Sequence, residues 1–496
     1  MTNKTGKTGA QPQSEAEKRQ HRRTVAAILL VDVVSFLGIL TETSLSVSFP
    51  ELSREFGVTL DTVQWLTSGY LLVISIIMVA SSFLNSRFTA RAMFRFGASA
   101  FIVGSLLCVF APNFPLLLTG RLLSAFAAGL NTPLMFNLVT ELMPVSQRGY
   151  WMGVVGLVVA LAPGLGPTVG GLVADQLGWR AVFWIVASLM AITLIAGWKL
   201  VGRYHEVTHP NFDWIRFLVV SLALTSFLIG FNQLSNGLAN PIFWTGIAIT
   251  AILTVVFIWL SRHSTRTLFD VNVFRNPRFN ITLIAYLLLQ ALNIGLSVVV
   301  PSYAQIVGGL STLVGGLILL PGSLIPSLFN PWYGKLYDQH GPKPTLLTAS
   351  ALLITGTLLL SVFGHHLTVW MLILFYLTVQ FGFRMAFNNT LTEGISVASP
   401  GRHADATAVM QAAQQYAGSI GTTVLSTIMA LSQRAATGPT DPRYPALTAI
   451  GATHAFWFTL AMSLIIAALY LTLFLRKNWR KPVPEPHEES EKLPTA

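Results

Sequence analysis

The chain has 496 residues, of which 53% are hydrophobic and only 10% are charged, whereas soluble globular proteins carry about 25% charged residues. Too few charges remain to cover a soluble surface, so the composition predicts a membrane protein. The net charge of +11 does not indicate nucleic-acid binding, because the basic residues cluster in short segments between apolar runs. The single cysteine, Cys108, excludes an internal disulfide and a cysteine-rich metal site.

Apolar runs recur along the whole chain, each close to the roughly 20 residues that cross a bilayer as a helix. We place them at residues 25–48, 63–84, 95–112, 115–138, 150–173, 180–202, 214–231, 241–261, 280–303, 311–331, 345–363, 368–391, 407–431 and 453–475. The sequence therefore predicts an all-α integral membrane protein of about fourteen transmembrane helices. Polar tails, residues 1–23 and 476–496, flank the spans.

The loop charges predict the orientation in the membrane. Basic residues gather in both tails and in alternate loops, at Arg87, Arg91, Arg95, Arg148, Lys199, Arg203, Arg262, Arg266, Arg275, Arg278, Lys335, Lys343 and Arg402. The opposite loops carry few charges, and these partly cancel. Because basic loops stay in the cytoplasm, we expect both termini on the cytoplasmic side, which agrees with an even number of spans.

The first run carries two acids, Asp32 and Glu42. An ionisable side chain inside a span is costly and by default marks a functional pathway. Ten residues separate them, roughly 15 Å along a helix, so both can face one cavity at different depths. Each is therefore a candidate for reversible protonation, although an acid that pairs near the membrane boundary is an alternative for both.

The fifth run contains GLVVALAPGLGPTVGG at residues 156–171. Its glycines and prolines would break a helix in water but are tolerated in lipid, and they leave a face that another helix can approach closely. A tight helix contact is one interpretation. The stretch also closely resembles the antiporter motif on the fifth helix of drug–proton antiporters in the major facilitator superfamily. The residues that carry this resemblance are Gly156, Pro163, Gly166, Pro167, Gly170 and Gly171.

Two further segments of the first half resemble motifs of that family. TETSLSVSFP at residues 41–50 is similar to its first-helix motif, although the family's acid position falls on Thr41 and the acid here is Glu42. Arg121, in the fourth run, matches an arginine that the family implicates in proton transfer. An arginine stays protonated, so the resemblance implies that Arg121 tunes a nearby acid, and we expect it to communicate with Glu42. An arginine that pairs with backbone carbonyls is the alternative.

Polar residues of the second half supply further candidates. Arg384 lies mid-span in the twelfth run, where it must be paired or face a cavity. Gln414 lies in the thirteenth run, within a glutamine- and glycine-rich pattern that resembles the family's eleventh core helix. Glutamines in a span need partners, so packing between helices and substrate contact are both open.

A motif that occurs in both halves of the sequence indicates the architecture. NPWYGKLYDQHGPK at residues 330–343 resembles the loop that joins the second and third helices of each half in this superfamily, and SSFLNSRFTAR at residues 81–91 is its counterpart. The resemblance assigns gating residues: Asn85, where an aspartate is usual, Arg87, Arg91, Gly334, Asp338, Gly341 and Lys343. Six-helix bundles at residues 24–203 and 264–475 are then parallel repeats, with an inserted helix pair at 204–263.

This 6+2+6 plan resembles the fourteen-span EmrB/QacA-type drug–proton antiporters. The resemblance implies a multi-pass bacterial cell-membrane protein that exports lipophilic or cationic drugs in exchange for protons, through a cavity between rocking halves. We expect a monomer that is not an enzyme and has no cofactor, metal site or nucleic-acid partner. A proton-coupled carrier of one metabolite in the same fold remains the alternative, since fold does not dictate function.

Overall fold

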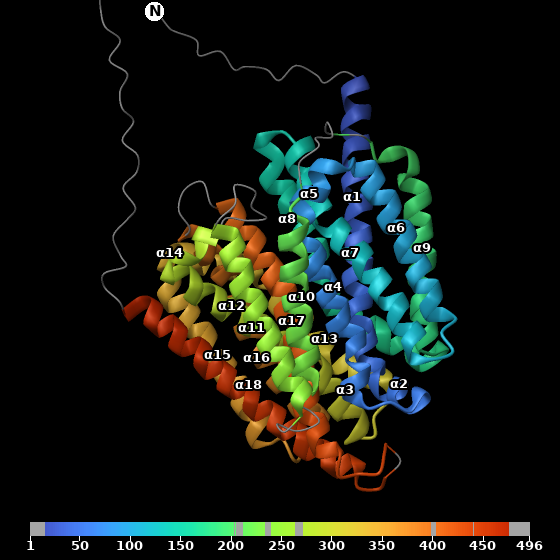
Figure 1. Cartoon of the computed structure of the whole chain (residues 1–496), viewed down its shortest axis with the longest axis vertical. Helices are drawn as coiled ribbons and strands as arrows, with labels where there is room; N and C mark the ends of the chain where they lie inside the picture. Colours follow the sequence, from blue (N-terminus) through green and yellow to red (C-terminus); the bar gives the residue numbers. More distant parts are fainter. Residues whose placement is uncertain are drawn as a thin grey trace, which may run out of the picture.

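The computed structural model describes residues 15–202, 204, 212–233, 240–262, 271–397, 403–439 and 441–475. In these ranges the protein is a bundle of helices without a β-strand (Figure 1). Arg203, Arg266 and Arg402, on which part of the predicted orientation depends, lie outside the described residues, as do residues 1–14 and 476–496.

The first half and the inserted pair follow the predicted runs closely. Their helices are α1 (Glu15–Ser44), η1 (Leu45–Ser48), α2 (Phe49–Phe56), α3 (Leu60–Val63), α4 (Trp65–Val79), α5 (Ser81–Arg87), α6 (Ala90–Val109), α7 (Phe114–Leu142), α8 (Val145–Leu177), α9 (Trp179–Leu200), α10 (Trp214–Asn232) and α11 (Pro241–Arg262). The first helix starts at Glu15, inside the stretch expected to be a polar tail.

The second half consists of η3 (Val271–Arg275), α12 (Pro277–Ile306), α13 (Thr312–Leu328), α14 (Asn330–His340), α15 (Pro342–Val362), α16 (Val369–Ser396), α17 (His403–Gln433) and α18 (Tyr444–Leu475). Side chains cap the first turn of several helices. Asn113, Ser311 and Thr368 each accept a hydrogen bond from the backbone N–H of the residue three positions later. Glycines in the left-handed region end α2 and precede α15, with φ of 63° at Gly57 and 80° at Gly341.

Twelve helices of the described chain are long and apolar enough to cross a membrane, or thirteen if α13 and α14, bent by 45° at their junction, form one span. The predicted fourteen are thus not all found by length and composition. The 31-residue α17 is not among the twelve; it carries four glutamines, Gln411, Gln414, Gln415 and Gln433, which lower its apolar character.

The predicted gating loops are partly helical. Asn85 and Arg87 lie in α5, and Gly334 and Asp338 lie in α14 rather than in an open loop. In the second copy, Pro331 near the start of the helix favours this outcome, since proline is well suited to the first helical turn.

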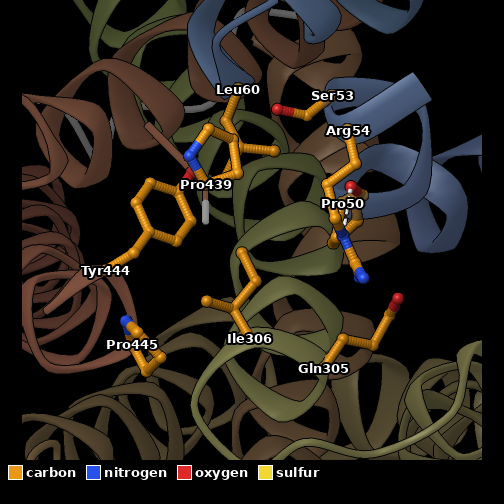
Figure 2. A pocket seen from close by; sticks show the side chains of 9 residues that line it. All are labelled: Pro50, Ser53, Arg54, Leu60, Gln305, Ile306, Pro439, Tyr444 and Pro445. Atoms are coloured by element: carbon orange, nitrogen blue, oxygen red, sulfur yellow. Dashed lines mark hydrogen bonds between the residues drawn. The ribbon is translucent and has the colours of Figure 1, made fainter. Parts of the chain in front are cut away.

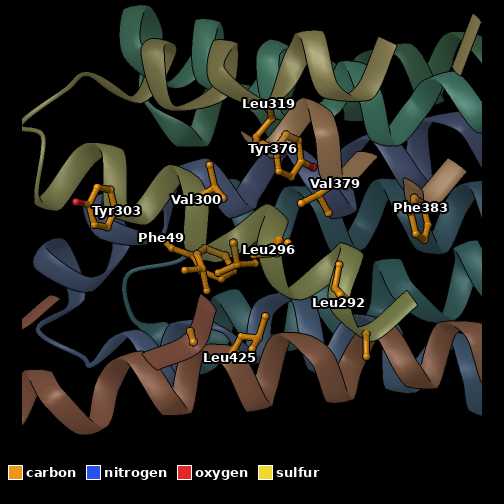
Figure 3. Close-up of a cluster of buried hydrophobic side chains, with 14 of the residues drawn as sticks. Phe49, Leu292, Leu296, Val300, Tyr303, Leu319, Tyr376, Val379, Phe383 and Leu425 are labelled. Atoms are coloured by element: carbon orange, nitrogen blue, oxygen red, sulfur yellow. The ribbon is translucent and has the colours of Figure 1, made fainter. Parts of the chain in front are cut away.

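The two halves pack together at one end of the bundle, which we call the α2 end (the lower end in Figure 1). There Leu45, Phe49 and Leu52 of the first half share one buried apolar cluster with Leu296 and Val300 of α12. Figure 3 shows Phe49 beside Leu296. Away from this end, each half has a buried cluster of its own. The apolar contact between the halves is therefore concentrated at the α2 end.

Candidate transport site

The glycine- and proline-rich stretch of α8 forms the seam between the halves. The helix continues through Pro163 and Pro167, and α8 packs along α13 of the second half. A Cβ atom at Gly171 would lie 2.7 Å from the carbonyl oxygen of Thr312, and one at Gly164 would lie 3.2 Å from the Cβ atom of Ser323. Only glycine allows so close an approach at Gly171, so this face brings two helix backbones together.

A second face of α8 packs on α1. A Cβ atom at Gly166 would lie 2.9 Å from the carbonyl oxygen of Leu40, and one at Gly170 would lie 2.7 Å from the Cα atom of Ser44. Gly156, by contrast, has open space around it. The motif therefore contains contact glycines toward both α1 and α13, and Gly156 has neither role in this conformation.

The other contact between the halves joins α4 to α17. The Ser419 hydroxyl donates to the Ser68 carbonyl oxygen over 2.6 Å, and the Ser75 hydroxyl donates to the Ala412 carbonyl oxygen over 2.9 Å. Next to this contact, the Tyr416 hydroxyl donates to the Leu224 carbonyl oxygen of α10 over 2.9 Å. The inserted pair is thereby attached to the second half beside the junction.

Arg121 is fully buried in the first half, at 0% exposure. Its Nε donates to the Leu66 carbonyl oxygen over 3.2 Å, and its guanidinium carbon lies 4.1 Å from the centre of the Tyr70 ring. Its two terminal nitrogens have no hydrogen-bond partner within the described chain. Pairing with a backbone carbonyl, the alternative for this residue, thus accounts for one of its nitrogens and leaves two donors available.

Glu42 and Asp32 are both buried on α1, at 4% and 1% exposure. Glu42 lies near enough to Arg121 for their charges to attract, yet these two described side chains form no ion pair within 4 Å. Tyr70 links Arg121 to α1 instead. Its ring lies against Arg121, and its hydroxyl donates to the carbonyl oxygen of Gly38 over 3.0 Å, one helical turn before Glu42. Asp32 has an oxygen, Oδ1, without a hydrogen-bond partner among the described residues.

Arg384 belongs to a polar cluster in the second half. It lies close enough to Tyr376 and Tyr333 for electrostatic interaction, and its Nε has no partner in the described part of the chain. Gln380 donates from Nε2 to the Tyr376 hydroxyl over 2.7 Å and to the Asn293 Oδ1 over 2.8 Å. The cluster therefore has both a cation and amide groups available beside α13.

Gln414 is held by an aromatic neighbour. The Tyr286 hydroxyl donates to its Oε1 over 2.8 Å, and the Tyr286 ring stacks on Phe387 with centroids 4.6 Å apart. Phe383 continues the row, 4.9 Å from Phe387. Packing within the second half thus explains this glutamine, while the aromatic row provides an apolar surface next to Arg384.

Two predicted gating residues of the first half, Arg91 and Asn85, have different surroundings. Arg91 donates from Nε to the Val201 carbonyl oxygen over 3.1 Å, at the end of α9, and Asn85 has an Oδ1 without a partner in the described structure. At the corresponding end of the second half, Glu393 accepts from the Tyr337 hydroxyl over 2.8 Å and pairs with Arg278 over 3.2 Å. This buried glutamate ties α12, α14 and α16 together.

A small cavity of about 170 Å³ lies between the halves at the α2 end (Figure 2). Arg54, Gln305 and Tyr444 are among its lining residues, and Gln305 donates from Nε2 to the Val47 carbonyl oxygen over 2.6 Å. Sites for drug-sized molecules are larger, at about 300–1,000 Å³. This cavity is therefore a gap in a closed junction rather than a drug site.

Sequence reasoning missed the residues that surround the candidate polar groups: Tyr70 beside Arg121, Tyr286 beside Gln414, and Tyr376, Gln380 and Asn293 in the cluster of Arg384. The only signal in the sequence was a polar atom in the middle of an apolar run. Among the described residues, no group of three or more His, Cys, Asp or Glu side chains is placed to hold a metal ion.

Comparison with known proteins gives the family. The sequence pattern described as the Major Facilitator Superfamily matches residues 31–422. The chain belongs to this superfamily. It is 31% identical to the lincomycin resistance protein LmrB of Listeria innocua over 94% of this chain and 99% of that protein, and 29% identical to the protein of the same name from Bacillus subtilis over 91% and 96%.

A solved structure confirms the fold. A bacterial homologue of the human lysosomal transporter Spinster, in an inward-facing and unoccupied conformation, aligns over 94% of this chain and 98% of its own with a TM-score of 0.67 and 14% identity. Membership of the superfamily confirms the prediction of a multi-pass cell-membrane transport protein that is not an enzyme. The role of each candidate residue stays a prediction.

Proposed function

We propose that this transporter exports lipophilic and cationic drugs across the bacterial cell membrane in exchange for protons. Two relatives that match almost the whole chain are named lincomycin resistance proteins, which supports drugs as the substrate class. The observation that carries the proton-coupled part is the pair of buried acids on α1, together with Arg121 in the interior of the same half.

The chemistry of these acids favours coupling. A buried carboxylate that lacks a partner is costly, and either a proton or a cationic substrate removes that cost. A single carboxyl group cannot hold both at once, so a cation that arrives from one side displaces the proton. Arg121, near Glu42 but not bonded to it, favours the deprotonated acid through its charge and makes the proton easier to release.

The conformation fits one stage of alternating access. We infer fourteen spans in a 6+2+6 order, with α13–α14 as one span and α17 as another. With both termini in the cytoplasm, the α2 end faces outward, where the halves share an apolar cluster and the glycine faces of α8 approach α13. The transporter is then closed to the outside, and rocking about the α8–α13 and α4–α17 contacts opens it.

Drug export by cells tests the proposal. The gene is expressed in a bacterium that lacks its own major efflux pumps, and accumulation of a lincosamide and of ethidium is followed with and without a protonophore. We expect lower accumulation of both compounds than in cells with an empty vector, and loss of that difference when the protonophore collapses the gradient. Suppose that the protein is present in the membrane, yet these cells accumulate both compounds as strongly as cells with an empty vector. That result would instead favour a carrier of one metabolite.

A further inference from the structure

A larger cavity lies on the flank of the first half, outside the junction of the halves. We call it the side cavity. It has a volume of about 680 Å³ and is formed by α4, α5, α6, α7, the start of α10 and residues next to these helices. Its lining residues are Ile77, Ala80, Phe83, Leu84, Arg87, Phe88, Ala92, Met93, Phe96, Phe126, Leu130, Phe212, Trp214 and Phe217. Asp32, Glu42 and Arg121 do not line it, so the proposed exchange does not account for it.

The exposure of its walls shows how the side cavity is reached. Ile77, Met93 and Leu130 form a buried floor. Phe96 and Trp214 at the rim are about 60% exposed, although both belong to helices long and apolar enough to span the membrane. The opening therefore faces the lipid side of the bundle, and a compound dissolved in the bilayer reaches it without crossing the junction between the halves.

Aromatic rings dominate the walls. Phe83 and Phe212 lie with ring centroids 4.3 Å apart, and Phe212 lies 4.7 Å from Trp214. On the opposite wall, Phe96 and Phe126 are 6.0 Å apart. Rings arranged in this way offer faces and edges to a further flat ring, and the volume falls in the range of about 300–1,000 Å³ that holds drug-sized molecules.

The charge of the lining selects among such molecules. Arg87 is the only charged side chain among the fourteen lining residues of the described structure. Arg87 already has an interaction partner elsewhere in the protein, so an ionised compound would lose its hydration in this apolar site without gaining a free counter-charge. The side cavity thus prefers uncharged compounds, unlike the cations that suit the acids of α1.

The inserted helix gives the side cavity a movable wall. Trp214 and Phe217 belong to α10 and Phe212 lies two residues before it, whereas the other walls belong to the first half. The hydrogen bond from Tyr416 attaches α10 to the second half. Rocking of the halves would therefore change the distance between the two walls, which links occupancy of the side cavity to the transport cycle.

We propose that the side cavity binds an uncharged, flat lipophilic aromatic compound, and that this compound enters from the cytoplasmic leaflet. The choice of leaflet rests on the orientation given under the proposed function, because Arg87 lies in the cytoplasmic gating segment. The binding site itself does not depend on proton exchange. The inserted helix pair accordingly has a role, since it completes the side cavity.

Binding of two related fluorescent probes tests this proposal. N-phenyl-1-naphthylamine and its sulfonate, 8-anilinonaphthalene-1-sulfonate, share the same rings but differ in charge. Each is titrated into the full-length protein in zwitterionic nanodiscs, with protein-free nanodiscs as the blank. Ala92→Phe places a ring in the side cavity, and Ser99→Phe adds the same ring to an exposed position of α6 that does not line it.

We expect saturable binding of both probes, roughly a tenfold loss of affinity in Ala92→Phe and no change in Ser99→Phe. The uncharged amine should bind roughly tenfold more tightly than the sulfonate. Signals no larger than the blank, equal affinities of the two phenylalanine variants, or a bound phospholipid that neither probe displaces would overturn the proposal. Because no transport is measured, these results are independent of whether drug–proton exchange occurs.

Discussion

Arg121 lies against the face of Tyr70, with its guanidinium carbon 4.1 Å from the ring centre, and the Tyr70 hydroxyl bonds the Gly38 carbonyl oxygen of α1. The arginine of α7 is thus linked to the helix that carries Glu42 through a tyrosine of α4, not through an ion pair. Tyr70, together with the Leu66 carbonyl oxygen that accepts from Arg121, thus positions this charge relative to α1.

Substitutions of Tyr70 should separate its ring from its hydroxyl. Tyr70→Phe keeps the face on which Arg121 lies and loses one hydrogen bond, worth about 1 kcal/mol, so we expect a modest fall in thermal midpoint and near-normal drug export. Tyr70→Leu also removes the cation–π contact, worth about 2 kcal/mol in a desolvated site. Export should then fall roughly tenfold or more, as measured by drug efflux at matched protein levels.

Arg121→Lys completes this series, because an ammonium group keeps the charge but loses the planar stack and the Nε contact with Leu66. It should behave like Tyr70→Leu. Full export by both Tyr70→Leu and Arg121→Lys would show that the position of the charge does not matter, and would contradict the role assigned to the Arg121–Tyr70 contact.

The glycines of α8 allow a matched comparison. Gly171→Ala places a methyl group 2.7 Å from the Thr312 carbonyl oxygen, whereas Gly156→Ala fills open space. Overpacking of this kind costs about 1–3 kcal/mol, and the cost falls on the closed junction at the α2 end. We therefore expect Gly171→Ala to populate the conformation that is open at this end.

Labelling of an introduced cysteine reports this change. Ser53→Cys places a thiol at the small cavity of Figure 2, and the native Cys108 is buried. A membrane-impermeant maleimide added from outside should label Ser53→Cys faster in the Gly171→Ala background than in the Gly156→Ala background. Equal labelling rates would mean that the α8–α13 contact does not hold the α2 end closed.

The loop before α18 supplies a pH prediction outside the membrane. The Arg443 side chain donates to both carboxylate oxygens of Asp441, and the backbone N–H groups of Thr437 and Arg443 donate to this carboxylate as well. These bonds hold the pKa of Asp441 well below its usual range. A depressed native pKa means that the ionised acid stabilises the loop above the usual value of about 3.9, and that the contribution is lost only as the pH falls through the lower native value.

Hydrogen exchange of the 434–443 segment measures this contribution. Asp441→Asn should accelerate exchange relative to the wild type by the same factor at every pH from 8 to 5. A factor that shrinks between pH 7 and pH 5 would show that Asp441 titrates in that range, contrary to the direction assigned to its pKa.

Hydropathy and the glycine–proline pattern were enough to predict the helical class and the packing helix. Lipid requires every span to satisfy its own backbone, so the runs predict where the helices lie, and α8 stays helical through Pro163 and Pro167. The same reasoning was less informative for α17, because Gln414 is satisfied by Tyr286 on another helix and such a partner cannot be identified from one run.

The candidate site was predictable only as a set of residues. Asp32, Glu42, Arg121 and Arg384 stand out because charges inside spans are rare. How they meet depends on the relative depth and rotation of helices that are far apart in sequence. Glu42 and Arg121 were expected to communicate, yet the element that joins them, Tyr70, lies in a third helix whose register against α1 and α7 is set by packing.

Proton movement in everted membrane vesicles tests the central claim, that α1 couples drug export to protons. A pH-gradient dye is followed while a panel of lipophilic cations is added to vesicles with wild-type protein, Glu42→Gln or Asp32→Asn. We predict that several cations release protons from wild-type vesicles and that Glu42→Gln, which keeps the shape of the side chain, abolishes the response. A response that survives in Glu42→Gln but is lost in Asp32→Asn would contradict the role of Glu42, and no response to any cation in wild-type vesicles would contradict drug–proton exchange itself.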